Sequence, residues 1–359
     1  MSGSNGMLGS ITEIAGITIG HHHRIDDDVT LGHGWAAGTT VVRIGTPESA
    51  SAPPVVAGEV RGGGPGTRET DLLDPANTVQ TAHAIVLSGG SAFGLSAAHG
   101  VMTSLEAAGV GLPMDLAGHV VPIVPAAVIF DLPVGAWDAR PDADFGTRAL
   151  ANASTEVADG SVGAGAGARA GALKGGVGTA SMRCSAAAAG VTVGAVMVAN
   201  PVGAVIDPTT GLPWTASAAE LAVHGLTAPA PEEVAALAEL DAEHTALNTT
   251  IGVVATDAAL DKASVRRVAM AAHDGLGRAI RPAHLPLDGD TIFAVATGAV
   301  HPSPQTPMPP GMNPDALVLG EVCRVAAIVV ERAIVAAVLS ATSVAGIPTY
   351  RDVVPSAFA

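Results

Sequence analysis

The sequence predicts a globular protein of mixed helices and strands, on three observations. Apolar residues make up 48% of the 359 residues and charged residues only 14%, which excludes a disordered chain because ample surface can be buried. The 44 glycines, 25 prolines and 3% aromatic residues indicate an interior of small aliphatic side chains in closely approaching layers. Short β-branched runs bounded by Gly or Pro alternate with segments of helical periodicity. The length fits either one large domain or two.

Residues 1–109 are predicted to contain mostly strands and one helix. Residues 61–75 form a glycine-rich loop in which backbone amides can converge. Residues 91–109 predict a helix, since small and apolar residues recur every three or four positions and Gly109 stops it. The strands are expected at residues 11–20, 39–45, 53–60 and 82–90.

After residue 109, residues 161–181 are expected to form a long glycine-dense loop, and residues 227–247 a Pro-rich, acidic linker at the surface. After the linker the composition changes to a β-branched strand. The predicted strands are residues 121–132, a pair within 192–207, and 248–256. The predicted helices are residues 147–155, 260–280 and 316–341.

Charge and cysteine content exclude several classes of partner. The net charge of −16 repels nucleic-acid backbones and anionic lipids. The uncharged stretch 184–206 is interrupted by Gly190, Gly194 and Pro201, so a buried strand is favoured over a membrane span. The sequence shows no leader, and Cys184 and Cys323 have no spacing typical of a disulfide framework. We therefore expect a cytoplasmic protein whose cysteines are small buried side chains.

Two common active-site motifs are incomplete in this chain. Around Ser91 the sequence is GGSAF, so Phe93 stands where the nucleophile elbow of a serine hydrolase requires glycine. The segment GARAGALKGG resembles a phosphate loop, but Leu173 precedes Lys174 and no Ser or Thr follows it. A serine α/β-hydrolase and a nucleotide-binding protein are therefore both disfavoured.

A metal site is also disfavoured by the sequence. Residues 21–23 are three histidines and residues 26–28 three aspartates, which are possible metal ligands. Consecutive side chains on a strand point to opposite faces, so the three histidines cannot all meet at one ion. The favoured interpretation is a solvated turn, and the pair Asp288 and Asp290 in DGD would by itself also be more typical of a turn.

The tripeptide Asn248-Thr249-Thr250 is the strongest candidate for catalysis. A hydroxyl residue between an exposed linker and a buried strand can attack the preceding carbonyl and, after hydrolysis of the ester, become a new N-terminus. One residue would then hold the nucleophilic hydroxyl together with an α-amine that titrates near neutrality and acts as its base. The tripeptide alone favours a capped turn, which is the commoner use of such residues.

Seven motifs, in order along nearly the whole chain, resemble the self-processing N-terminal-nucleophile aminopeptidases. They are GGGPGTRETDLLDP (62–75), LSGGSAFGL (87–95), VPIVPAAVIFDLP (121–133), ALKGGVG (172–178), ANPVGAVID (199–207), NTTIGVVATD (248–257) and LDGDTIFAVATG (287–298). This family includes D-aminopeptidase, the β-peptidyl aminopeptidases and the nylon-oligomer hydrolase. The resemblance implies an α+β fold of four layers, αββα, shared with ornithine acetyltransferase.

The resemblance also implies how the chain is organised. Residues 1–359 would form a single domain, cut by the protein itself into an α chain of residues 1–248 and a β chain of residues 249–359. Family members commonly assemble as tetramers of such pairs. The activity expected is hydrolysis of amide bonds in small peptides or ω-amino amides through an acyl-enzyme, without metal or cofactor.

The resemblance assigns a role to each polar residue of the motifs. Thr249 matches the nucleophile, with cleavage after Asn248, and Asn200 matches the amide that stabilises the oxyanion. Lys174 matches a lysine near the nucleophile, where a cation can lower the pKa of a neighbouring amine. Asp288 and Asp290 match an acidic pair that orients the amine and hydroxyl of Thr249. The Thr nucleophile and the two aspartates are similar to the nylon-oligomer branch. The other lysine, Lys262, is expected to be solvated on its helix.

One departure from the family pattern leaves alternatives open. Relatives have Tyr near the reaction centre where this chain has Phe130, so either the phenol is dispensable or the substrate differs. An acyltransferase on the same scaffold, or a processed protein without catalysis, are the alternatives to an amide hydrolase. A metal-dependent hydrolase built on residues 21–28 is a third alternative, which a chelator would reveal.

Overall fold

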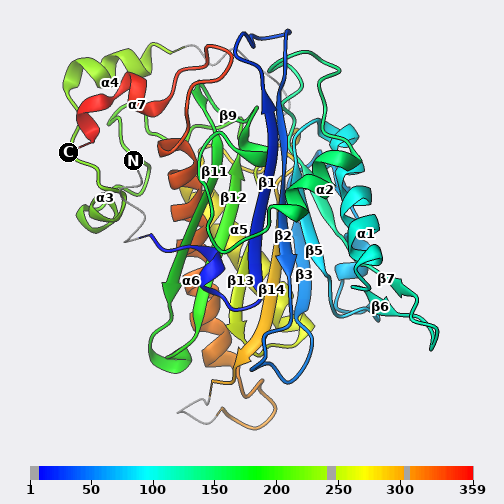
Figure 1. Ribbon diagram of the computed structural model, residues 1–359. Coiled ribbons are helices and arrows are strands. Elements are labelled where there is room, and N and C mark those ends of the chain that lie inside the picture. The colour runs from blue at the N-terminus through cyan, green and yellow to red at the C-terminus, as the bar shows by residue number, and fades with distance from the viewer. Residues whose placement is uncertain (1–7, 241–247, 303–307, 359) are drawn as a thin grey trace.

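The computed structural model describes residues 8–240, 248–302 and 308–358 and arranges them in four layers (Figure 1). Two five-stranded sheets lie face to face in the middle, and helices cover the outer face of each sheet. The α+β fold of αββα layers that the resemblance implies is therefore confirmed.

The first sheet has the strand order β1-β2-β5-β8-β4. Its pairs are antiparallel except β5 with β8, which run parallel. Helices α1 (Ala97–Ala107) and α2 (Ala143–Ala151) pack on its outer face, where Val41 and Val86 meet Val101. The strands are β1 (Ile17–Ile25), β2 (Ala36–Ile44), β4 (Thr67–Arg68), β5 (Ala84–Ser88) and β8 (Ala126–Val128).

The second sheet has the strand order β11-β12-β13-β14-β3. Its pairs are antiparallel except β13 with β14, which run parallel and so begin at the same edge. Helices α5 (Lys262–Ala279) and α6 (Ala316–Leu339) cover its outer face. The strands are β3 (Val55–Val60), β11 (Gly176–Arg183), β12 (Thr192–Ala199), β13 (Ile251–Ala258) and β14 (Thr291–Val300).

The core between the sheets follows from the two-residue period of the strands. In β13, Ile251, Val253 and Ala255 face the other sheet, while Val254 and Ala258 face the helices. Both faces of this strand are therefore buried, which is why its sequence is an almost continuous apolar run rather than an alternating one. This burial holds the start of β13, where the candidate nucleophile lies, in a rigid framework.

The remaining elements connect the layers or lie at their ends. Two short hairpins are made by β6 (Leu112–Pro113) with β7 (Val120–Val121) and by β9 (Arg169–Ala170) with β10 (Leu173–Lys174). The other helices are α3 (Ala218–His224), α4 (Pro231–Ala238) and α7 (Tyr350–Val353). The 3-10 helices are η1 (Ile11–Glu13), η2 (Asp71–Leu73), η3 (Ser91–Ser96), η4 (Gly163–Gly165), η5 (Ala186–Ala188) and η6 (Pro355–Ala357).

The prediction of a loop over residues 161–181 is wrong in its second half. This stretch contains the β9–β10 hairpin and most of β11. Glycine is needed in β11 because α6 lies against the strand backbone: a Cβ on Gly176 would lie 2.7 Å from the carbonyl oxygen of Ala337, and one on Gly178 2.2 Å from that of Ala333. The glycines therefore mark close helix–sheet packing rather than a flexible connection.

Three other predicted boundaries also change. Residues 121–132 hold only the end of β7 and the short strand β8, because Pro122 and Pro125 have no N–H to donate to a neighbouring strand. The second strand predicted within 192–207 is absent among the described residues, since β12 ends at Ala199 before Asn200-Pro201. The acidic linker contains α4, which begins with Pro231 followed by Glu232 and Glu233, favourable residues for a helix start. Residues 241–247 of the linker lie outside the described residues.

The prediction of solvated side chains is wrong for Lys262 and partly wrong for residues 21–28. The histidines at 21–23 lie in β1 rather than in a turn, whereas Asp27 and Asp28 do lie in an exposed turn. His21 is half-buried, with Nδ1 2.9 Å from Thr40 Oγ1. Lys262 is 4% exposed, because its Nζ donates to the carbonyl oxygens of Leu72 and Val79 at 2.9 and 2.6 Å. Backbone carbonyl oxygens, rather than solvent, therefore accept the hydrogen bonds of the Lys262 ammonium group.

Both cysteines are free: Cys184 is buried in the core, as expected, whereas Cys323 of α6 is only partly buried against it. Among the described helices, none combines the length and apolar character that a membrane crossing requires. Across residues 8–240, 248–302 and 308–358, no group of three or more His, Cys, Asp or Glu side chains is arranged to hold a metal ion.

Candidate active site

The two polar segments of the site are brought together by the one parallel pairing of the second sheet. Because β13 and β14 run parallel, the residues just before each strand lie side by side at the same edge. Asn248 bridges Asp288, and Ile251 pairs with Thr291. Residues 248–250 and 288–290, which are 40 positions apart, therefore form one cluster, as the resemblance implies.

Thr249 is 5% exposed and directs its hydroxyl at the carbonyl of the preceding residue. Its Oγ1 donates to the carbonyl oxygen of Asn248 at 2.6 Å, and the N–H of Gly289 donates to the same oxygen at 3.3 Å. The backbone N–H of Thr249 donates to the carbonyl oxygen of Asn200 at 2.8 Å. The carbonyl of the Asn248–Thr249 peptide bond thus receives two donors at once.

The two carboxylates of the acidic pair accept hydrogen bonds from backbone N–H groups. Asp290 Oδ1 accepts the N–H of Thr250 at 2.8 Å, and Asp288 Oδ2 accepts the N–H of Leu285 at 2.7 Å. Burial, with a smaller contribution from the neighbouring charge of Asp290, raises the pKa of Asp288 to about 6. The contact of Asp290 is thus with the residue after the candidate nucleophile, and orientation of the Thr249 hydroxyl by the pair stays a prediction.

Asn200 follows β12 and is 1% exposed. Its Oδ1 accepts the N–H of Arg169 at 2.9 Å, and its Nδ2 donates to the carbonyl oxygen of Phe130 at 3.2 Å. The side chain therefore links three segments, and its backbone carbonyl holds Thr249. One of the two amide hydrogens is engaged by Phe130, so an oxyanion role for the amide stays a prediction.

Lys174 is fully buried and donates from Nζ to the carbonyl oxygens of Gly165 and Gly175, both at 2.8 Å. Burial lowers the pKa of this lysine to about 7, and the charge of Asp131 opposes the shift. Burial likewise raises the pKa of Asp131 to about 7. The two contacts tie Lys174 to the glycine-rich segments beside Asn200, and a direct action on the amine of Thr249 stays a prediction.

A pocket of about 240 Å³ opens beside the candidate nucleophile. Thr249 and Asn248 line it together with Ser91, Phe130 and Leu287, and all the described residues that line it are uncharged. Phe130, which replaces the family Tyr, lines this pocket, and its ring packs edge-on against Trp137 with ring centroids 6.3 Å apart. The departure from the family pattern therefore lies in the wall of the pocket itself.

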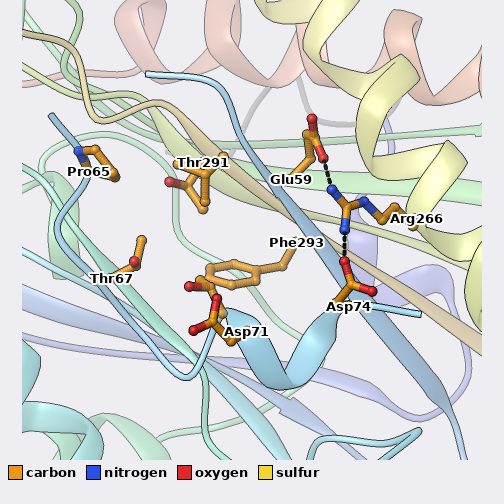
Figure 2. A pocket seen from close by; sticks show the side chains of 11 residues that line it. Glu59, Pro65, Thr67, Asp71, Asp74, Arg266, Thr291 and Phe293 are labelled. Atoms are coloured by element: carbon orange, nitrogen blue, oxygen red, sulfur yellow. Dashed lines mark hydrogen bonds and ion pairs between the residues drawn. The ribbon is translucent and has the colours of Figure 1, made fainter. Parts of the chain in front are cut away.

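A second pocket, of about 370 Å³, shares Pro65 with the first (Figure 2). Figure 2 shows Arg266 between Glu59 and Asp74, and its guanidinium nitrogens lie 3.0 and 2.7 Å from the two carboxylates. Asp71 lies apart from this pair. No sequence pattern indicated this pocket, because its charged residues come from β3, the end of η2 and α5 and meet only in the fold.

Sequence reasoning also missed Asp131, Gly289 and His284. Asp131 stands in an apolar run directly after Phe130, and a charge in such a run could have indicated a buried partner. Gly289 lies between Asp288 and Asp290, but no sequence pattern shows that its N–H reaches the carbonyl oxygen of Asn248. His284 contacts Asp290, with Nδ1 2.8 Å from Oδ2, and its separation by six residues carries no recognisable period.

Comparisons with known proteins identify the family of the chain. The model of a family described as peptidase family S58 matches residues 9–351. An uncharacterized aminopeptidase of Mycobacterium tuberculosis is 55% identical over 98% of this chain and 99% of its own length. A 6-aminohexanoate-oligomer endohydrolase of a Kocuria species is 33% identical over 63% of each chain.

Solved structures show the same fold. A beta-aminopeptidase of a Burkholderia species superposes with a TM-score of 0.71 at 23% identity, covering 96% of this chain and 91% of its own. The L-aminopeptidase D-Ala-esterase/amidase of Ochrobactrum anthropi, described as a variant of the Ntn hydrolase fold, superposes with a TM-score of 0.67 at 20% identity, covering 92% and 86%.

Proposed function

The chain belongs to peptidase family S58 and is a hydrolase of the aminopeptidase type, and we propose that it activates itself by cutting the bond between Asn248 and Thr249. The observation that carries the proposal is the pair of donors on the Asn248 carbonyl oxygen, Thr249 Oγ1 at 2.6 Å and Gly289 N–H at 3.3 Å. A nucleophile and an oxyanion donor thus meet at one peptide bond, the arrangement that acyl transfer requires.

Self-cleavage would proceed in two steps. Thr249 Oγ1 attacks the carbonyl carbon of Asn248 and loses its proton. The C–N bond then breaks, and the leaving nitrogen gains a proton, which gives an ester and a free amine. Gly289 N–H donates to the oxygen as negative charge develops on it. Water then hydrolyses the ester, which leaves a carboxylate on Asn248 and a free amine and hydroxyl on Thr249.

The same groups would then act on a substrate amide. A free α-amine has an ordinary pKa of about 8, so about a tenth of it is unprotonated at pH 7, and this form can accept the hydroxyl proton during attack. The carbonyl of Asn200, which holds this nitrogen at 2.8 Å, would keep it beside Oγ1. Gly289 N–H, with Asn200 Nδ2 as the second donor, would stabilise the oxyanion of each tetrahedral intermediate.

The pocket supports a small amide substrate. Cleavage releases Asn248 from a space with uncharged walls, so the acyl group of a substrate can enter where Asn248 lies in the uncut chain. The substrate class we propose is small peptides or ω-amino amides, which the names of the relatives support. We propose that Thr249 is the nucleophile throughout.

Location and assembly are proposed on separate grounds. Free Cys184 and Cys323 support a reducing compartment such as the cytoplasm. The family resemblance supports a tetramer of cut αβ pairs, and exposed apolar side chains such as Met114 and Leu116 are available for contacts between copies. Sedimentation velocity tests the assembly: a monomeric αβ pair at micromolar concentration would contradict it.

The role of Thr249 is tested with Thr249→Ala and Thr249→Ser assayed on a panel of peptide and ω-amino amides. We expect Thr249→Ala to lose turnover and Thr249→Ser to retain it, because serine keeps a hydroxyl and, after cleavage, an α-amine. Turnover by Thr249→Ala at the wild-type rate would refute the proposed mechanism.

A further inference from the structure

The loop before the acidic pair carries a histidine in an unusual backbone conformation. His284 has a φ of +56°, in the left-handed region that side-chain-bearing residues other than Asn, Asp and His seldom adopt. This conformation turns consecutive N–H groups toward the acidic pair. His284 N–H donates to Asp290 Oδ2 at 3.2 Å, and Leu285 N–H donates to Asp288 Oδ2 at 2.7 Å.

The side chain of His284 adds a second bond to the same carboxylate oxygen. Nδ1 lies 2.8 Å from Asp290 Oδ2, and the Asp290 side chain is 3% exposed. The other oxygen, Oδ1, is engaged by the N–H of Thr250. Because a carboxylate accepts hydrogen bonds, the ring proton of a neutral His284 lies on Nδ1, and three N–H donors fix the orientation of Asp290.

The ring of His284 is itself held in place by α5. It packs edge-on against His273, with ring centroids 5.0 Å apart, and Nε2 of His273 bonds the carbonyl oxygen of Glu59 at 3.0 Å. Burial lowers the pKa of His273 to about 4, so this neighbour stays uncharged near neutrality. A chain of contacts therefore runs from α5 through His284 and Asp290 to the backbone of Thr250.

We propose that His284 is a positioning residue for the nucleophile, which acts through Asp290. By bonding Asp290 Oδ2, it keeps Oδ1 on the N–H of Thr250 and so holds Thr249 with its hydroxyl on the carbonyl that is attacked. The inference rests on the proposed function, because it assigns to His284 the placement of the Thr249 hydroxyl in self-cleavage and in turnover. It adds a residue that the motif comparison did not identify.

Two substitutions separate the side-chain bond from the backbone conformation. His284→Gly accepts the positive φ and removes the donor, whereas His284→Asn tolerates the same φ and keeps an N–H donor near the position of Nδ1. Ala345→Gly is the matched control, since Ala345 also has a positive φ, of +53°, and lies far along the chain from the site. The measurements are the rate of self-cleavage of fresh precursor, kcat per titrated active site, KM and Tm.

We expect His284→Gly to slow self-cleavage and to lower kcat by about tenfold to a hundredfold, the usual effect of losing a hydrogen bond to a charged group. KM should change by less than about threefold, because the substrate pocket is untouched. His284→Asn should recover most of both rates, and Ala345→Gly should match the wild type. A structural role alone would lower Tm and the folded fraction but leave kcat per active site unchanged.

Wild-type rates in His284→Gly, or equal losses in His284→Gly and His284→Asn, would overturn the proposal. Its failure is distinguishable from failure of the proposed function, which is decided by Thr249→Ala alone. If Thr249→Ala still cleaves itself, the proposed function is wrong. If it does not cleave and His284→Gly behaves as wild type, only the role of His284 is wrong.

Discussion

Gly289 has no side chain because Thr249 occupies the space where one would lie. A Cβ at this position would be 2.7 Å from Thr249 Oγ1 and 3.1 Å from the carbonyl oxygen of Gly64. The backbone must also stay where it is, since its N–H bonds the carbonyl oxygen of Asn248. One residue thus combines a steric requirement with a hydrogen-bond donor.

We expect Gly289→Ala to block self-cleavage, because the added methyl group displaces either the hydroxyl or the N–H donor. Loss of an oxyanion donor alone slows acyl transfer by about a hundredfold to a thousandfold. The measurement is the fraction of cut chain over time by denaturing electrophoresis. The control is Gly277→Ala, where a Cβ meets no heavy atom within 4 Å. Normal cleavage of Gly289→Ala would contradict the geometry described.

Lys174 predicts a pH dependence of stability. Burial lowers its pKa in the folded protein to about 7, against an ordinary value of 10.5. Between these values the unfolded chain keeps a proton that the folded protein has released, so Lys174 makes stability rise with pH across that window. We expect Lys174→Met to flatten the rise in the free energy of unfolding between about pH 8 and 10, measured by urea denaturation.

The comparison with Lys174→Met isolates the lysine, because other groups with shifted pKa values, such as Cys184 and Lys262, are present in both proteins. Burial raises the pKa of Asp131 to about 7. Above about pH 8 this carboxyl is therefore mostly ionised in both the folded and the unfolded protein, and it contributes little to the pH dependence of stability there. An identical slope in wild type and Lys174→Met would contradict a depressed lysine pKa.

At the scale of elements, the contact between α5 and α6 depends on one glycine. A Cβ on Gly275 would lie 2.1 Å from the carbonyl oxygen of Ala327 in α6, so the two helix backbones approach as closely as glycine permits. Gly277, two residues further along the same helix, is exposed and faces open space. The two positions differ in surroundings while sharing helix and residue type.

We expect opposite effects from the same substitution at these positions. Gly277→Ala should stabilise the protein by about 0.5–1 kcal/mol, the cost of glycine in a helix interior. Gly275→Ala should destabilise it by at least about 1–3 kcal/mol, because α5 and α6 must move apart. Thermal or urea denaturation of both variants is the test, and equal shifts would show that the α5–α6 spacing is not set by Gly275.

The close packing of α6 against its neighbours also explains why some elements could be predicted from the sequence and others could not. Residues 251–258 were found as a β-branched run after a change of composition, and residues 316–339 as a long apolar helical segment. Strand β11 was missed because its glycines, required by α6, look like a loop. In the site, Thr249 and the aspartates were reached through the resemblance. The contacts of His284 join separate elements and follow no local pattern, while Asp131 could have been noticed only as a charge in an apolar run.

At the scale of the molecule, the proposed cut lies where it can leave the fold intact. The β chain would contribute β13 and β14, and these strands are flanked by β12 and β3 of the α chain within one sheet. Helices α5 and α6 of the β chain cover the same sheet. Breaking one peptide bond at the edge removes none of these contacts.

We therefore expect the cut chains to stay together under native conditions. Gel filtration should show both in one peak, while denaturing electrophoresis of that peak shows two bands. Separate native elution of the two chains would contradict the sheet order described.

The central claim is that Thr249 becomes an N-terminus, and intact-mass spectrometry of freshly purified protein tests it most directly. We predict two masses, which correspond to a chain that ends at Asn248 and a chain that spans Thr249 to Ala359, together with a single full-length mass for Thr249→Ala. A single full-length mass in a wild-type preparation that hydrolyses amides would contradict the account.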